Sequence, residues 1–99
     1  IQNSVLERKH DAGEKLTILD VREEAEFMFN HIPGSISIPL GELENRLSEL
    51  NKETEIYVIC RTGKRSDFAA QTLTKHGFTN VLNVVPGICQ WEGKTINNL

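Results

Sequence analysis

Residues 56–59, Ile-Tyr-Val-Ile, are apolar at every position and lead directly into Cys60. A strand that is apolar on both faces belongs in the middle of a parallel sheet covered by helices on both sides. Parallel neighbours need crossover connections, usually helices, so this one segment favours an α/β architecture. It also places a cysteine at the carboxyl end of a central strand.

Three other short segments have the composition of strands. They are residues 16–19, which end at Asp20, residues 35–38, which are stopped by Pro39, and residues 81–85. Helical patterns separate the strands, so right-handed crossovers predict a mostly parallel sheet of about four to five strands. The predicted fold class is therefore a small three-layer α/β domain, with the sheet flanked by helices.

Four segments have helical periodicity, namely residues 4–12, 23–29, 40–50 and 66–76. The third is expected to be an amphipathic surface helix whose inward-facing leucines are Leu40, Leu43, Leu47 and Leu50. Ser66 is the expected N-cap of the fourth helix, and Gly77 its end. The inward-facing stripe of this last helix should be Phe68, Ala69, Thr72 and Leu73.

The length of 99 residues suits one domain spanning residues 1–99. The first residue is Ile1 rather than methionine, which indicates either processing or a module from a longer polypeptide. No apolar run is long enough to cross a bilayer and no signal-peptide pattern is present, so the expected location is cytoplasmic. The net charge of −3 gives no general attraction for nucleic acid or anionic membranes, and neither is an expected partner.

The two cysteines, Cys60 and Cys89, are too few for a disulfide scaffold and lack C-x-x-C spacing. His10, His31 and His76 are scattered without metal-ligand spacing. We therefore expect neither a metal nor another cofactor. A reactive thiol remains as the candidate chemistry.

Cys60 is the candidate nucleophile because of the loop that follows it. Arg61, Lys64 and Arg65 put three cations into five residues of a mildly acidic chain. Loop amides and the start of the next helix should surround an accessible thiol, and both these dipoles and the cations should lower its pKa. The thiolate could then attack a sulfane sulfur and carry it as a persulfide cradled by the amides.

The loop cations could also orient an anionic donor such as thiosulfate, unless carboxylates pair with them. Arg65 and Arg61 are the preferred candidates, ahead of Lys64. Cys89 has no cation within two residues, and an idle or packed thiol is the favoured interpretation. Its turn follows the last strand and so lies at the same sheet edge as Cys60, which leaves an internal disulfide or a sulfur relay open.

Four blocks of this sequence, in order, resemble the rhodanese superfamily over nearly the whole chain. They are residues 18–23 (ILDVRE), 31–39 (HIPGSISIP), 60–66 (CRTGKRS) and 85–91 (VPGICQW). Two departures stand out. Asn30 replaces a common glycine, which is tolerable because asparagine accepts left-handed backbone angles. Pro86 replaces another glycine and should stiffen the turn beside the site.

The resemblance implies that Cys60 carries the sulfur and that a cradle of backbone amides holds the persulfide. The cradle residues are Arg61, Thr62, Gly63, Lys64 and Arg65. It also implies supporting roles for Asp20 and Arg22, most simply as a structural ion pair, and Ser66 is added as a supporting residue where the next helix begins.

The leading functional hypothesis is a sulfurtransferase that moves sulfane sulfur from thiosulfate or a low-molecular-weight persulfide to a thiol or cyanide. The alternative is a sulfur-carrier or regulatory module that receives sulfur from a fused domain or a separate protein and turns over little free substrate. A phosphatase or arsenate reductase is disfavoured. The phosphatase relatives have five residues between cysteine and arginine, whereas four separate Cys60 from Arg65 here.

Overall fold

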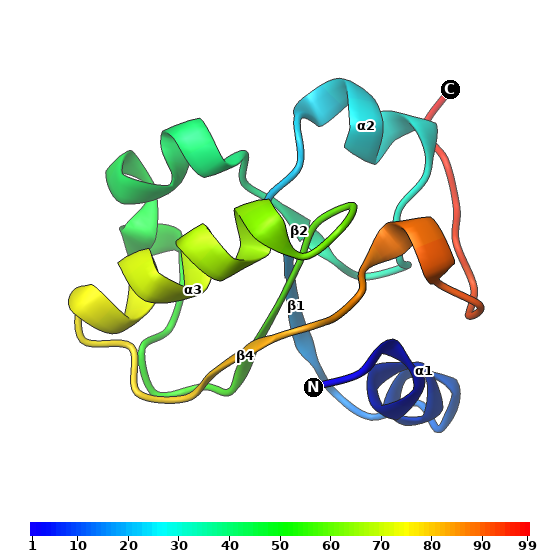
Figure 1. Ribbon diagram of the computed structural model, residues 1–99, viewed down its shortest axis with the longest axis horizontal. Helices are drawn as coiled ribbons and strands as arrows, with labels where there is room; N and C mark the ends of the chain where they lie inside the picture. Colours follow the sequence, from blue (N-terminus) through cyan, green and yellow to red (C-terminus); the bar gives the residue numbers. More distant parts are fainter.

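The computed structural model describes residues 1–99 and is built around one sheet of four strands in the order β2-β1-β3-β4 (Figure 1). The strands are β1 (Thr17–Asp20), β2 (Ile36–Ser37), β3 (Ile56–Ile59) and β4 (Val81–Asn83). Every pairing is parallel. The predicted mostly parallel sheet of about four to five strands is therefore confirmed, and the all-apolar β3 is buried at each position as its sequence indicated.

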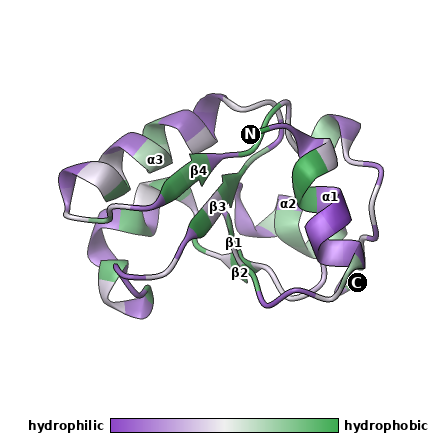
Figure 2. Ribbon diagram, turned by 90° about the horizontal axis from the view of Figure 1, so that it is seen from below, coloured by the Kyte–Doolittle hydropathy of each residue, from purple (hydrophilic) through white to green (hydrophobic).

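Helices cover both faces of this sheet. Helix α3 (Lys64–Lys75) packs on one face, and α1 (Asn3–Asp11) on the other (Figure 2). Along β3, alternate side chains enter the two cores: Val58 lies in the core on the α3 side, and Tyr57 lies in the core on the α1 side. The three-layer prediction is confirmed. No helix combines the length and the hydropathy that a bilayer crossing requires.

The carboxyl ends of the four parallel strands lie at the same edge of the sheet. From β1 the chain continues through α2 (Glu24–Phe29) to β2 on one side, whereas β3 and β4 occupy the other side. The strand order therefore reverses between β1 and β3. In open α/β sheets, ligands bind beyond the strand ends at such a reversal. Cys60 follows β3 at this point.

Residues 40–50 do not form the predicted amphipathic helix. They form two short 3₁₀ segments, η1 (Leu40–Asn45) and η2 (Leu47–Glu49), separated at Arg46 by a residue with φ −125°. Within the first segment, Leu40 and Leu43 are three residues apart and lie on one face, because a 3₁₀ helix has three residues per turn. The inward face was predicted correctly, since the leucines pack on the core.

The start of α3 was also wrongly predicted. The helix begins at Lys64, and its N-cap is Gly63 rather than Ser66. Ser66 therefore lies inside the first turn, where its side chain is fully buried. Phe68, predicted to face inward, is 63% exposed. The buried stripe consists of Ser66, Ala69 and Leu73, spaced three and four residues apart.

Candidate active site

The Cys60 sulfur lies inside a ring of hydrogen-bonding groups from its own loop. Its Sγ is 3.1 Å from the amide nitrogen of Gly63, 3.3 Å from the amide nitrogen of Ser66 and 3.3 Å from the Ser66 hydroxyl oxygen. The thiol can donate to this hydroxyl, and when the thiol is ionised the hydroxyl donates to the sulfur. The amides come from the loop and the first turn of α3, where unpaired N–H groups are available.

This ring makes the thiol acidic. Burial raises the pKa of Cys60, but hydrogen bonds from the Ser66 hydroxyl and from the amides of Ser66, Gly63 and Thr62 outweigh it, so the pKa lies below its ordinary value. The predicted direction agrees with this result. The sequence predicted that both the amides and the loop cations would lower this pKa. In the structure, hydrogen bonds rather than the cations produce most of the lowering.

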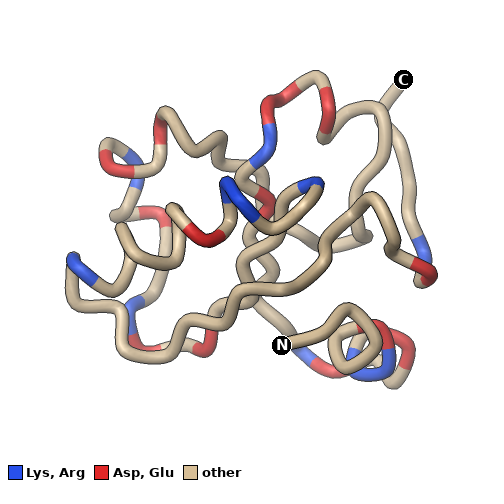
Figure 3. Tube along the Cα trace, viewed as in Figure 1, with Lys and Arg blue, Asp and Glu red and all other residues tan.

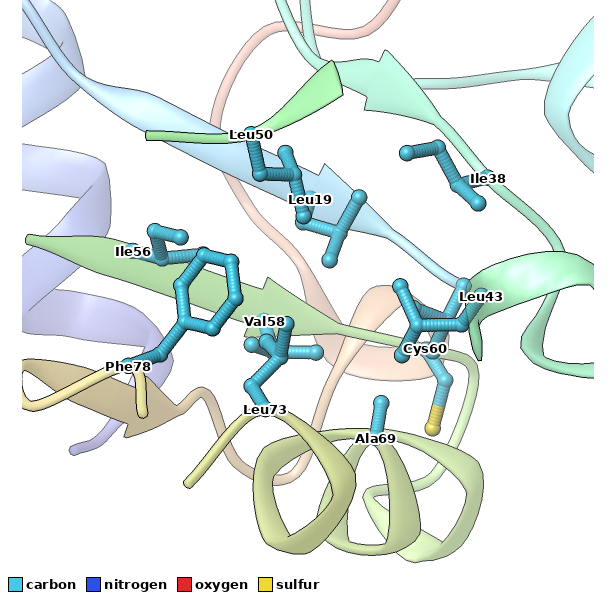
Figure 4. Packing of buried hydrophobic residues seen from close by; sticks show 11 residues of the cluster. Leu19, Ile38, Leu43, Leu50, Ile56, Val58, Cys60, Ala69, Leu73 and Phe78 are labelled. Carbon is cyan, nitrogen blue, oxygen red and sulfur yellow. The ribbon is translucent and has the colours of Figure 1, made fainter. Parts of the chain in front are cut away.

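Cys60 is less accessible than the sequence suggested. Only 1% of the residue is exposed. Figure 4 shows its side chain directed from the end of β3 toward α3, among the buried neighbours Leu43 and Ala69. The apolar character of the strand continues one residue into the loop, so the thiol is part of the core as well as of the site.

The loop backbone depends on two glycines. Gly63 has φ +94°, in the left-handed region that favours glycine, and this conformation turns its amide toward Cys60. Gly87, from the turn after β4, lies against the loop backbone, where an added Cβ would be 2.5 Å from the carbonyl oxygen of Cys60. The amide of Ile88 donates to that carbonyl at 2.9 Å, and the amide of Cys89 donates to the carbonyl of Arg61 at 3.1 Å.

Asn3 holds this turn from the other end of the chain and was missed by the sequence interpretation. Its amide side chain donates to the carbonyl of Gly87 at 2.8 Å and accepts from the Gly87 amide at 3.1 Å. Asn3 is 6% exposed. Because the two residues are 84 positions apart, no local pattern reveals the contact. The one available signal is a polar residue at the start of an otherwise amphipathic helix.

The three loop cations have different surroundings. Arg65 forms a bidentate ion pair with Glu26 of α2 at 2.6 and 3.0 Å, and this pair lowers the pKa of Glu26 to about 2. Arg61 and Lys64 are exposed and form no ion pair. Figure 3 shows the basic start of α3 below the acidic residues of α2. The carboxylate partner that the sequence left open thus belongs to Arg65.

Asp20 and Arg22 form the expected structural pair. The Arg22 guanidinium donates to both carboxylate oxygens of Asp20, with 2.8 Å between Nη2 and Oδ2, and both side chains are almost fully buried. The same guanidinium donates to the carbonyl of Asn30 at 2.6 Å. Asn30 has φ −161°, so the left-handed conformation considered for it is not used.

The geometry defines a class of protein: an α/β domain with an acidic cysteine in a ring of backbone amides at the end of its central parallel strand. Comparison with known proteins agrees. The family model described as "Rhodanese-like domain" matches residues 2–94. The chain belongs to the rhodanese-like domain family.

Two relatives come from Bacillus subtilis strain 168. The chain is 53% identical over 95 residues to "Putative sulfur carrier protein YrkF", covering 96% of this chain and 51% of that protein. It is 37% identical over 95 residues to "Putative sulfurtransferase YtwF", covering 96% of this chain and 91% of that protein. The chain thus spans about half the length of the first of these relatives and most of the second.

The fold is shared with solved structures. A rhodanese-related protein from Thermoplasma volcanium superposes with a TM-score of 0.86 at 33% identity, covering 97% of this chain and 95% of that one. The predicted family and fold are both confirmed.

Proposed function

We propose that this chain is a sulfurtransferase that carries sulfane sulfur on Cys60. The thiolate attacks the outer sulfur of a donor, the donor's S–S bond breaks, and sulfite or an organic thiolate leaves. An acceptor thiolate or cyanide then attacks the outer sulfur of the Cys60 persulfide and regenerates the Cys60 thiolate. The observation that carries the proposal is the ring of amide and hydroxyl groups within 3.3 Å of Sγ.

The loop supports sulfur rather than phosphate as the transferred group. Four residues separate Cys60 from Arg65, and the amides of Gly63 and Ser66 already lie within hydrogen-bonding distance of Sγ. A ring this small stabilises a charge on or next to the sulfur itself. A tetrahedral phosphoryl group needs more amides around a larger space.

The loop cations have separate roles in this proposal. Arg61 and Lys64 are exposed and attract an anionic donor. Arg65 is held by Glu26 and fixes the start of α3 relative to α2. Ser66 contributes an amide and a hydroxyl to the sulfur, and the pair formed by Asp20 and Arg22 keeps the neighbouring strand end rigid. A cytoplasmic location and the single-domain organisation stay predictions.

The second candidate is a carrier module with little turnover of free substrates. It is favoured by the relative called a sulfur carrier, of which this chain spans 51%. In that case the donor or acceptor is a protein, either fused to this domain or separate from it. The chemistry at Cys60 is the same, and only the partner differs.

Loading of Cys60 is the decisive measurement because its sulfur is enclosed in the free protein. The wild type, Cys60→Ser and Cys89→Ser are incubated with thiosulfate or glutathione persulfide, and intact mass and peptide mapping locate any added sulfur. Cyanide or a thiol is then added as acceptor.

A gain of one sulfur on Cys60 that the acceptor removes with turnover supports the enzyme. A stable gain without turnover supports the carrier. No gain from any donor, or a gain that persists in Cys60→Ser, contradicts both. Hydrolysis of an aryl phosphate that is lost in Cys60→Ser would favour the phosphatase instead.

A further inference from the structure

The N-terminal end of the chain lies beside the segment that follows β4 (Figure 1). The amide of Asn3 donates to the carbonyl of Val85 at 2.9 Å, and the amide of Val85 donates to the carbonyl of Ile1 at 2.8 Å. The Asn3 side chain reaches further along this segment to Gly87. Its Nδ2 donates to the Gly87 carbonyl at 2.8 Å, and its Oδ1 accepts from the Gly87 amide at 3.1 Å. One side chain therefore holds the peptide groups on both sides of Gly87.

Gly87 is a residue whose orientation depends on such a contact. Its φ of +118° lies in the region that favours glycine, and with no side chain of its own it is positioned by its backbone hydrogen bonds. Asn3 is only 6% exposed, so water does not replace these bonds. A buried amide is costly unless its polar atoms are paired, and Gly87 pairs both of them. Asn3 and Gly87 thus hold each other in one arrangement.

The turn that Asn3 holds is bonded to the backbone of the Cys60 loop. The amide of Ile88 donates to the carbonyl of Cys60 at 2.9 Å, and the amide of Cys89 donates to the carbonyl of Arg61 at 3.1 Å. The two backbones are in close contact, because a Cβ on Gly87 would lie only 2.5 Å from the Cys60 carbonyl oxygen. The position of the turn therefore sets the direction of both loop carbonyls.

The planarity of the peptide group carries this direction to the sulfur. The carbonyl of Arg61 and the N–H of Thr62 belong to one trans peptide group and point in opposite directions. A carbonyl held toward the turn thus directs the Thr62 N–H to the other side of the loop. Burial raises the pKa of Cys60, but hydrogen bonds to its sulfur, led by the Ser66 hydroxyl and including the Thr62 amide, lower it overall. Rotation of this peptide group would remove one of those hydrogen bonds.

We propose that Asn3 is a positioning residue for the reaction at Cys60, acting through the turn after β4 on the loop amides that face the sulfur. This inference rests on the proposed function and adds to it a residue from the opposite end of the chain. Residues 84–88 carry no titratable side chain, so the influence of Asn3 passes through backbone geometry rather than through charge.

The first test measures the acidity of Cys60. Asn3→Ala removes both side-chain hydrogen bonds to the turn, so the thiolate loses stabilisation and its pKa rises. We expect the midpoint of the pH profile for Cys60 alkylation by iodoacetamide to rise by about half a pH unit, with peptide mapping to separate Cys60 from Cys89. The midpoint reports acidity even where a loosened loop makes the sulfur more accessible.

The same variant should lose turnover rather than substrate affinity. We expect kcat for sulfur transfer from thiosulfate to cyanide to fall about threefold in Asn3→Ala. KM for thiosulfate should stay within about twofold, because the exposed Arg61 and Lys64 are unchanged. A rise in KM with kcat unchanged would overturn the inference, since it would place Asn3 in substrate binding.

His10→Ala is the matched control on the same helix. His10 Nε2 lies 2.9 Å from the carbonyl oxygen of Pro33, in a turn that no backbone hydrogen bond joins to residues 60–66. This variant should be destabilised without any change in the midpoint. An unchanged midpoint in Asn3→Ala, or an equal shift in both variants, would overturn the inference. Every variant keeps the ionisable side chains on and beside the loop, which are Arg61, Lys64, Arg65, Asp67, Glu26 and Cys89.

The second test follows the bonds between the turn and the loop by amide hydrogen exchange. We expect the amides of Ile88 and Cys89 to exchange about tenfold faster in Asn3→Ala, with Val58 in β3 unchanged. Asn3→Ser has a side chain one bond shorter and can satisfy only part of the contact with Gly87, so its effects should be intermediate. It carries both tests should Asn3→Ala fail to fold.

Unchanged exchange at Ile88 and Cys89 would overturn the inference. So would faster exchange with no change in the alkylation midpoint, because Asn3 would then hold the turn without affecting the thiol. Neither measurement uses a sulfur donor. A chain that no donor loads would therefore refute the proposed function while leaving the role of Asn3 in the acidity of Cys60 intact.

Discussion

The two cysteines of this chain lie at the same edge of one sheet in opposite surroundings. Cys60 is enclosed by amides and a hydroxyl at the start of α3, and its pKa is lowered. Cys89 is exposed on a short 3₁₀ turn, where its backbone amide donates a hydrogen bond to the carbonyl of Arg61. Exposure and nucleophilic character are therefore separated, because the groups that stabilise a thiolate are the groups that enclose it.

The strongest change should come from disrupting the contact between the turn that carries Cys89 and the Cys60 loop. Gly87→Ala places a Cβ against the carbonyls of Cys60 and Arg61 at a residue with φ +118°. We expect the free energy of unfolding in urea to fall by about 2–4 kcal/mol, from backbone strain and overpacking. Gly41→Ala is the control, because nothing lies near an added Cβ there. An equal small loss in both variants would show that the turn can move away from the loop.

The next effect concerns the acidity of Cys60. Ser66→Ala removes the hydroxyl that hydrogen-bonds to Sγ, so the pKa of Cys60 should rise and the thiolate fraction at pH 7 should fall. We expect sulfur loading or alkylation of Cys60 at pH 7 to slow about tenfold and its pH profile to move to higher pH. Thr74→Ala, on an exposed position of the same helix, should change neither. An unchanged profile in Ser66→Ala would mean that the amides alone set the pKa.

A smaller effect tests the ion pair that ties the Cys60 loop to α2. The pKa of Glu26 is about 2 in the folded chain against an ordinary 4.5, so its stabilisation is present above about pH 4.5 and is lost as the pH falls toward 2. Glu26→Gln should lower the unfolding free energy at pH 7 by about 1 kcal/mol or less, because the pair is one-third exposed. The difference from wild type should vanish near pH 2. A difference that persists in acid would indicate lost packing instead.

The smallest effect is expected at Cys89 itself. Cys89→Ser should keep sulfur transfer to cyanide within about twofold of wild type, since the Cys89 side chain forms no hydrogen bond to the Cys60 loop and a serine fits the same exposed turn. A tenfold loss, or peptide mapping that finds the added sulfur on Cys89, would establish a relay and contradict the favoured interpretation of an idle thiol.

The sequence predicted the parts of this molecule that depend on local pattern. The all-apolar strand before Cys60, the loop composition and the family blocks were enough for the fold, the family and a lowered thiol pKa. The errors arose where three-dimensional packing decides. Serine is a residue type that favours the N-cap position, but the left-handed Gly63 starts the helix earlier. Ser66 then lies in the first turn with its hydroxyl toward the Cys60 sulfur.

Contacts between residues distant in the sequence could not be predicted for the same reason. The clamp of Asn3 on Gly87 and the pairing of Glu26 with Arg65 join elements that only the folded chain brings together. The burial of Cys60 was missed because a cationic loop indicates solvent, whereas Arg61 and Lys64 are exposed and the thiol points into the core.

The Arg22 guanidinium, which joins Asp20 to the carbonyl of Asn30, also holds the end of α2 in place. Moving the end of α2 would take the Asn30 carbonyl away from this buried guanidinium, while Asp20 would stay paired with it, at a cost of about 1–3 kcal/mol. The end of α2 beside the Cys60 loop is thus preorganised. A molecule that binds against this helix end loses its own freedom of motion but orders little of the protein. A modest contact area can therefore give useful affinity.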